Sequence, residues 1–309
     1  MMNPNLVFLL SLIFIFLGYL LKRVGFLGEI ESRIISKIVL NVTLPALIIR
    51  TIIGADLSTS LLYLPISAIV YGVVVCGILI FLNRQKLPED KAIYSMASIG
   101  FNNGMFAYPI IEGIYGITGL QYLAIFDIGS GLSVFGVSYM LAAYFHAKMT
   151  QDHFQMTPIT FLRMILGSVP FVSYIIAISL NLSGVRFAPF IDSVFAVPAR
   201  ANMVLVLLLI GLHLEFNFKG ADRRKILQIF GLRYGLGILL GAVVFFLPIS
   251  PAALKGVLIL VFILPVSMAI LPYSSKFGFD MKTAGALVNY SIIISFILMW
   301  IAINIIQVA

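Results

Sequence analysis

The sequence has few of the residues that keep a soluble protein in solution. Only 10% of its residues are charged, while 61% are hydrophobic, and it contains one tryptophan and one cysteine. Soluble domains carry about 25% charged residues, so this composition excludes an ordinary soluble fold. Cys76, the single cysteine, lies in an apolar run and excludes an intrachain disulfide. These shortages predict an integral membrane protein surrounded by a lipid bilayer.

Motifs of enzymes and of cofactor sites are also missing. The chain has no HExxH sequence, no glycine-rich phosphate loop and no serine nucleophile elbow. Its histidines are too dispersed for a metal site, and no cofactor is expected. The net charge of +8 is scattered over short connections without a basic domain, which argues against nucleic-acid binding. The sequence does not predict an enzyme.

Apolar stretches long enough to cross a bilayer recur along the whole chain. Sixteen of the 20 lysines and arginines, including Arg233, lie in or beside the odd-numbered connections between these stretches. The positive-inside rule then makes those connections cytoplasmic and places both termini outside, and the short loops favour a bacterial inner membrane. The ten predicted spans are residues 5–23, 32–53, 60–83, 91–113, 118–147, 158–181, 190–213, 224–247, 252–275 and 281–307.

The fourth span is interrupted near its centre by the sequence FNNGMFAYP, residues 101–109. Pro109 has no N–H for a helical hydrogen bond and its ring crowds the preceding turn, so the helix is expected to kink or part there. Backbone groups freed by a break cannot face lipid, and such breaks occur where protein or a wet cavity surrounds them. This segment is therefore the best pointer to a ligand site.

The ninth span contains a comparable segment, LPVSMAILP, residues 264–272. An internal repeat with interrupted helices at matching positions is typical of secondary transporters. A division near residue 150 gives two repeats, 1–150 and 151–309, and five spans in each make the second repeat inverted. The predicted fold is thus an all-α membrane protein with ten transmembrane helices in two inverted five-helix repeats, whose helices four and nine are broken. At one fixed offset the aligned pairs are Asn102 with Pro265, Met105 with Met268 and Pro109 with Pro272.

Polar side chains within the spans are the candidate binding residues. Asn102 and Asn103 lie roughly 16 Å from the cytoplasmic end of their span, where an amide can hold a carboxylate and release it, or cap the broken helix. Arg200 needs Asp127 or a bound anion as its partner if it lies deep in the seventh span, and otherwise reaches the outer surface. Asp127 is the one carboxylate well inside a span and the candidate for coupling; a structural ion pair or hydrogen bond is the alternative.

The order of these segments resembles the auxin efflux carrier family, which includes bacterial malonate and malate permeases and plant auxin exporters. The similarity rests on SIGFNNGMFAYPIIEGIYG, on LAIFDIGSGLSVFG and on ILPVSMAILPYSSKFGFDMKTAGALVNYS, and it extends over essentially the whole chain. The resemblance implies a scaffold domain from spans 1, 2, 6 and 7, and a moving transport domain from spans 3, 4, 5, 8, 9 and 10. It also implies that Asn102 binds a carboxylate and that Pro109 marks the first crossover, with Pro265 or Pro272 at the second.

Together these features predict a secondary carrier of small organic anions, such as malate, malonate or auxin-like acids, with an elevator-type movement of its transport domain. The coupling ion is left open between a proton and sodium. Two other classes also remain open: a sodium-coupled carrier similar to the bile-acid symporters, and a membrane sensor that binds a ligand without moving it. The sequence does not fix the oligomeric state, for which a homodimer is one alternative.

Overall fold

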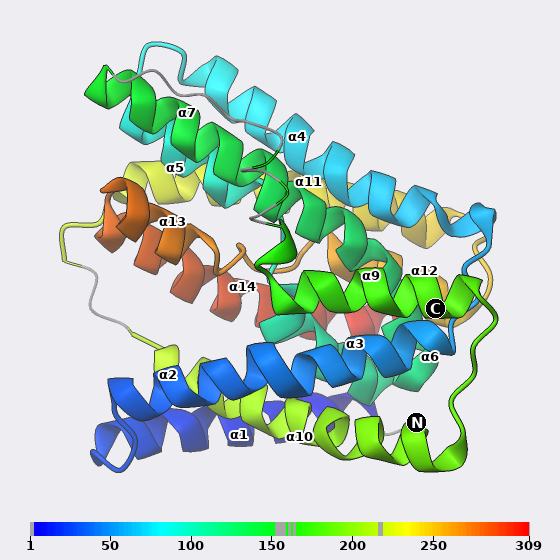
Figure 1. Cartoon of the computed structure of the whole chain (residues 1–309). Helices are drawn as coiled ribbons and strands as arrows, with labels where there is room; N and C mark the ends of the chain where they lie inside the picture. The colour runs from blue at the N-terminus through cyan, green and yellow to red at the C-terminus, as the bar shows by residue number, and fades with distance from the viewer. Residues whose placement is uncertain (1–2, 152–158, 160–161, 163–164, 216–218, 309) are drawn as a thin grey trace. The chain divides into compact units, whose positions relative to one another are not determined.

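The computed structural model describes residues 3–308 apart from 152–158, 160–161, 163–164 and 216–218. In this part of the chain all regular structure is helical, and the only β contact is an isolated bridge between Phe101 and Val266. Among the described residues, seven helical stretches are long and apolar enough to cross a membrane, which makes the chain an all-α membrane protein (Figure 1). They are Pro4–Arg23, Glu29–Ile53, Thr59–Leu82, Asn103–Thr150, Pro189–His213, Arg223–Phe246 and Met281–Gln307.

Contacts within the chain divide it into two compact units, neither of which is a continuous half of the sequence. Unit 1 comprises Met1–Leu62, Asn103–Ile128 and Leu166–Leu214. Unit 2 comprises Tyr63–Asn102, Gly129–Ile165 and Glu215–Ala309. The chain therefore passes from unit 2 to unit 1 between Asn102 and Asn103, inside the segment that the sequence singles out. The division into repeats at residue 150 stays a prediction.

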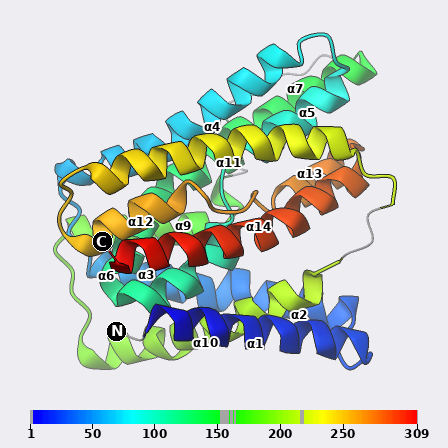
Figure 2. The same ribbon diagram turned by 180° about the vertical axis from the view of Figure 1, so that it is seen from behind.

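In unit 1, α1 (Pro4–Arg23) packs along α10 (Pro189–His213), and the two helices lie side by side in both views (Figures 1 and 2). Gly18 and Gly211 lie at their contact. A Cβ atom on Gly211 would collide with the carbonyl of Ile15, and one on Gly18 would collide with the carbonyl of Leu208. Two glycines thus allow the backbones of these helices to approach closely.

The rest of unit 1 is built around a long helical stretch. α2 (Glu29–Ile38) continues through one π-helical turn, Val39–Thr43, into α3 (Leu44–Ile53), which packs on α9 (Val169–Leu182) and on α10. The last carbonyls of α3 need partners because no further turn follows. The side-chain amide of Asn181 in α9 supplies them by donating to the carbonyls of Ile52, Ile53 and Ala55 at 2.8, 3.0 and 2.9 Å.

Unit 2 contains α4 (Tyr63–Leu82), α5 (Pro88–Ser98), α7 (Tyr139–Thr150), α11 (Arg223–Phe246), α12 (Ala252–Val261), α13 (Ile270–Phe277) and α14 (Met281–Val308). Within it α5 packs on α4 and α7, while α11 packs on α12 and α14 (Figure 2). Proline opens α5, where its missing N–H costs nothing. α6 (Tyr108–Leu132) is interrupted at Gly116 (φ 63°) and passes from unit 1 into unit 2 after Ile128.

The predicted break in the fourth span lies earlier than Pro109. α5 ends at Ser98, residues 99–102 are not helical, and a π-helical turn, Asn103–Ala107, leads into α6. Pro109 is the second residue of α6, a position that proline tolerates because the first N–H groups of a helix have no partner within it. The wider π turn before it absorbs the space that the ring needs. The chain is therefore interrupted at the polar residues and not at the proline.

Candidate functional site

Two interrupted helices cross within unit 2. After α5 ends at Ser98 and α12 ends at Val261, their continuing segments run antiparallel and form the bridge between Phe101 and Val266. The backbone N–H of Asn102 donates to the carbonyl of Pro265 at 3.1 Å. The crossing thus satisfies some of the backbone groups that the two breaks set free.

Serine hydroxyls satisfy further backbone groups at this crossing. The N–H of Phe101 donates to Oγ of Ser130 at 3.2 Å, and the N–H of Val266 donates to Oγ of Ser291 at 3.1 Å. Each non-helical segment therefore has one backbone contact to the other segment and one to a serine of a neighbouring helix. This arrangement holds irregular backbone inside protein, as a membrane environment requires.

Asn102 carries an unused hydrogen-bond donor at the crossing. Its side chain is only 5% exposed, and its Nδ2 has no partner among the described residues. A buried polar group without a partner costs free energy, and in native structures a bound water, an ion or a functional contact commonly accounts for such a group. A ligand oxygen is the partner that this donor fits, because an amide N–H donates well to a carboxylate.

A buried arginine joins the two interrupted helices from a third helix. Arg233 of α11 is 0% exposed. Its Nη1 donates to two carbonyls at the end of α5, those of Ala97 at 3.2 Å and Ser98 at 2.9 Å. Its Nη2 donates to the carbonyls of Gly100 at 2.9 Å, Leu264 at 3.4 Å and Pro265 at 3.3 Å. One guanidinium group therefore contacts the backbones of both crossing segments.

Aromatic rings enclose this guanidinium. Its central carbon lies 4.5 Å from the centre of the Phe101 ring and 6.0 Å from that of Tyr71. Both rings offer a favourable cation–π contact. The hydroxyl of Tyr71 also donates to the backbone carbonyl of Arg233, which fixes α11 next to α4. The rings and carbonyls together take the place of water around the charge.

A second polar cluster lies in unit 1 and centres on Asp127. Nδ2 of Asn103 donates to Oδ1 of Asp127 at 2.5 Å, and the hydroxyl of Tyr174 donates to its Oδ2 at 2.7 Å. The hydroxyl of Tyr108 contacts that of Tyr174 in turn. Oδ1 of Asn103 has no partner among the described residues, although this side chain is only 2% exposed. A partly buried acid in a chain of hydroxyl and amide groups is an arrangement that can hold and pass a proton.

The structure places the other predicted site residues as follows. Pro109 is buried in the first turn of α6, next to Tyr108 of the Asp127 cluster. Arg200 is exposed on α10, and among the described residues it is not an ion-pair partner of Asp127. Pro265 lies at the crossing, whereas Pro272 is exposed in the first turn of α13.

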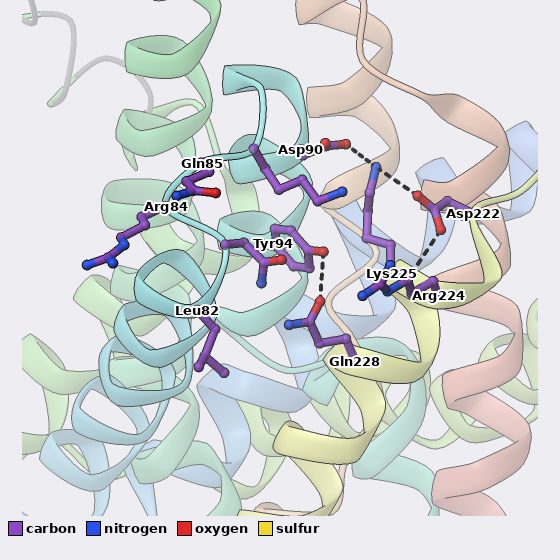
Figure 3. Close-up of a pocket in the computed structure, with 11 residues that line it drawn as sticks. Leu82, Arg84, Gln85, Asp90, Tyr94, Asp222, Arg224, Lys225 and Gln228 are labelled. Carbon is purple, nitrogen blue, oxygen red and sulfur yellow. Dashed lines mark hydrogen bonds and ion pairs between the residues drawn. The ribbon is translucent and has the colours of Figure 1, made fainter.

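A polar pocket of about 730 Å³ lies elsewhere in unit 2, where the connection between α4 and α5 meets the start of α11 (Figure 3). Lys225 points into it, is 6% exposed, and forms ion pairs with Asp90 and, at 3.8 Å, with Asp222. Tyr94 donates to Gln228 at 2.9 Å. No described side chain of this pocket has a buried polar atom without a partner, so its interactions explain the packing of the connection and do not call for a ligand.

Arg233 was not among the residues predicted for the site, because the charge pattern assigned it to a cytoplasmic connection. α11 begins at Arg223, so Arg233 lies about 15 Å along the helix. Depth within a span is the signal that selected Arg200, and the same criterion applied to α11 selects Arg233. The remaining basic residues of that connection still lie near the start of α11, so the excess on the odd-numbered connections persists without Arg233.

Long apolar helices, two of them interrupted and crossing, are typical of a membrane transporter. The family described as membrane transport protein matches residues 5–303, and the chain belongs to this family, that of the auxin efflux carriers. An uncharacterized transporter of Methanothermobacter thermautotrophicus is 26% identical over 236 residues, which cover 75% of this chain and 74% of that protein. One of Methanocaldococcus jannaschii is 30% identical over 135 residues, covering 41% of this chain and 44% of that protein. The resemblance read from the sequence is thereby confirmed.

Proposed function

We propose that this transporter is a secondary carrier of small organic anions that binds a carboxylate group at the helix crossing of unit 2. The observation that carries the proposal is the buried Nδ2 of Asn102, which has no partner among the described residues and lies on a non-helical segment. Broken helices near the middle of a span are where secondary transporters bind substrate. Malate, malonate and auxin-like acids are the first substrates to test, since the family resemblance implies them.

The arrangement into ten spans and two inverted repeats is part of the same proposal. Its support is the similar position of the two breaks: α5 and α12 each end where a non-helical segment begins, and the next α-helix in each case has a proline in its first turn. Pro109 and Pro272 occupy those early positions, and Asn102 and Pro265 meet at the crossing. Inverted repeats are common in carriers with this kind of broken helix.

The division of labour between a scaffold and a moving domain rests on the two compact units. Unit 1 contains the first, second and seventh predicted spans and the sixth from Leu166 onward, which the resemblance assigns to the scaffold, and it also contains Asn103–Ile128. Unit 2 contains the helix crossing. We infer that unit 2 carries the bound anion during an elevator-type movement, and that Asp127 is the residue that couples a proton to it.

Uptake into proteoliposomes tests the proposal. Purified protein is reconstituted and offered radiolabelled malate, malonate and an indole carboxylate, with and without a proton gradient and with choline replacing sodium. We expect uptake of at least one carboxylate that Asn102→Ala abolishes and Asn304→Ala preserves, because Asn304 bonds within its own helix near the end of α14. Binding without uptake would indicate the sensor, and strict sodium dependence would indicate the sodium-coupled carrier.

A further inference from the structure

The carbonyl ends of the two interrupted helices, α5 and α12, lie close to a buried positive charge. The last carbonyls of a helix have no partner within it and carry the negative end of the helix dipole. Some are satisfied by the following backbone, since Ile99 donates to Ser95, and Ile263 donates to Leu260. The carbonyls of Ala97 and Ser98 and those of the segment after α12 receive the Arg233 guanidinium instead.

No acid in the described part of the chain balances this guanidinium. Among the described residues, no carboxylate oxygen lies within 4.0 Å of the Arg233 side chain. A buried arginine is normally paired with a carboxylate or with several hydrogen-bond acceptors, and here only neutral carbonyls and two rings surround it. The crossing therefore keeps one formal positive charge, which attracts an anion that enters it, while the negative ends of the two helix dipoles act against it.

The arginine and Asn102 share one acceptor. The carbonyl of Pro265 accepts from the backbone N–H of Asn102 and from Nη2 of Arg233. A carboxylate held by the Asn102 side chain would thus be bound next to a segment that the guanidinium holds in place. In carriers with broken helices, unwound carbonyls and helix C-terminal ends are also the groups that coordinate a cation.

We propose that Arg233 is the permanent cation of the crossing: its guanidinium holds the two interrupted segments in register and supplies the positive charge for carboxylate binding at Asn102. The role in carboxylate binding rests on the proposed function, whereas the role in holding the two segments does not. Arg233 is a positioning residue for the anion site, because Nη1 and Nη2 donate to the backbone of the two segments; only its buried Nε–H has no hydrogen-bond partner among the described residues. Its removal should release both segments together.

Chemical rescue tests the first part without any substrate. Arg233→Ala should lower Tm by about 10 °C or more, because the carbonyls of both segments lose a buried charged partner. Millimolar guanidinium should restore about half of that loss by occupying the space left by the side chain, whereas urea, which has a similar shape and no charge, should not. Arg223→Ala, at the exposed start of α11, is the control and should respond to neither. Equal rescue by urea, or no rescue by guanidinium, would overturn this part.

Conservative variants test the second part and remain informative if Arg233→Ala does not fold. We expect Arg233→Lys, which keeps the charge, to bind the transported carboxylate about tenfold more weakly than the wild type, and Arg233→Gln, which is neutral, to show no binding. Equal affinity in the glutamine variant and the wild type would refute the charge role. If no carboxylate binds the wild-type protein, the proposed function fails, while the rescue experiment still decides whether Arg233 holds the crossing.

Discussion

The two polar clusters bury opposite charges in similar ways. In unit 2 the guanidinium of Arg233 is surrounded by five backbone carbonyls, and in unit 1 the carboxylate of Asp127 accepts from an amide and a phenol. Neither charge has an ion-pair partner among the described residues. Both charges are held by neutral dipoles, which stabilise a charge without neutralising it.

The difference between the clusters lies in what their partners do. Among the described residues, every hydrogen-bond acceptor of the Arg233 side chain is a backbone carbonyl of the two crossing segments, so the arginine is part of the structure of the crossing. The partners of Asp127 are side chains that can rotate, donate or exchange a proton, so the acid can change its protonation without disrupting a helix. We therefore expect the arginine to matter most for folding and the acid to matter most for coupling.

Replacement of Arg233 by methionine should give the largest loss of stability. The variant keeps the aliphatic bulk but leaves the carbonyls of both segments without their donor, so we expect unfolding to become easier by about 3–5 kcal/mol. A thiol-reactive dye can follow thermal unfolding in detergent, because Cys76 is free and buried. A change below about 1 kcal/mol would show that the crossing does not depend on the arginine.

Asp127→Asn should destabilise the protein less than Arg233→Met does, and it should impair the coupling of uptake to the proton gradient more. The asparagine can still accept from Tyr174, while its own amide opposes that of Asn103, and we expect a loss of about 1–2 kcal/mol. Uptake should continue but lose its dependence on a proton gradient. An Asp127→Asn carrier that kept the full proton dependence would remove Asp127 from the coupling role and leave it as a structural hydrogen-bond acceptor.

Substitutions of the neighbouring residues Asn102 and Asn103 should affect carboxylate binding and protein stability to different degrees. Asn103→Ala removes a donor to Asp127, and we expect it to cost about 1 kcal/mol, whereas Asn102→Ala removes a side-chain amide whose Nδ2 has no protein partner and should cost less. The order should reverse for carboxylate affinity, measured by thermal shift, with the larger loss in Asn102→Ala. Equal effects of the two substitutions on both quantities would contradict the assignment of the two amides to different clusters.

A salt bridge near the surface provides the smallest expected effect. Arg50 donates to Asp192 at 2.9 Å within unit 1, but its side chain is 33% exposed and that of Asp192 is 44% exposed. Exposed pairs contribute little because water screens them, so Arg50→Gln should change the free energy of unfolding by less than about 1 kcal/mol. A loss comparable to that of Arg233→Met would show that charge removal in general, and not the helix crossing, causes the effect.

Much of the fold was predictable because hydropathy and interruptions are local signals. The predicted second span, residues 32–53, lies within Glu29–Ile53, and the seventh, 190–213, agrees with Pro189–His213. Asn102 and Pro265 drew attention because amides and prolines interrupt apolar runs. The break next to Pro109 was placed too late because its position depends on how the backbone of residues 99–102 is satisfied at the crossing, which the sequence does not show.

Local patterns in the sequence could not predict which groups contact the buried charged side chains. The sequence left Arg200 open between a deep cation, paired with Asp127 or a bound anion, and a side chain that reaches the outer surface. The structure gives Asp127 two neutral donors and leaves Arg200 exposed. Arg233 was overlooked because its role depends on carbonyls from α5 and from the segment after α12, far away in sequence. A role of Arg200 in substrate binding stays a prediction, which carboxylate binding by an Arg200 variant would test.

The most direct test is the thermal stabilisation of the purified protein by a panel of mono- and dicarboxylates, with Asn102→Ala measured in parallel. A ligand that binds only the folded state stabilises it by about 2.7 kcal/mol at a hundredfold excess over Kd. The account predicts a shift from at least one carboxylate in the wild type and none from the same compound in Asn102→Ala. The same shift in both proteins would contradict the account, because the carboxylate would then be bound away from the helix crossing.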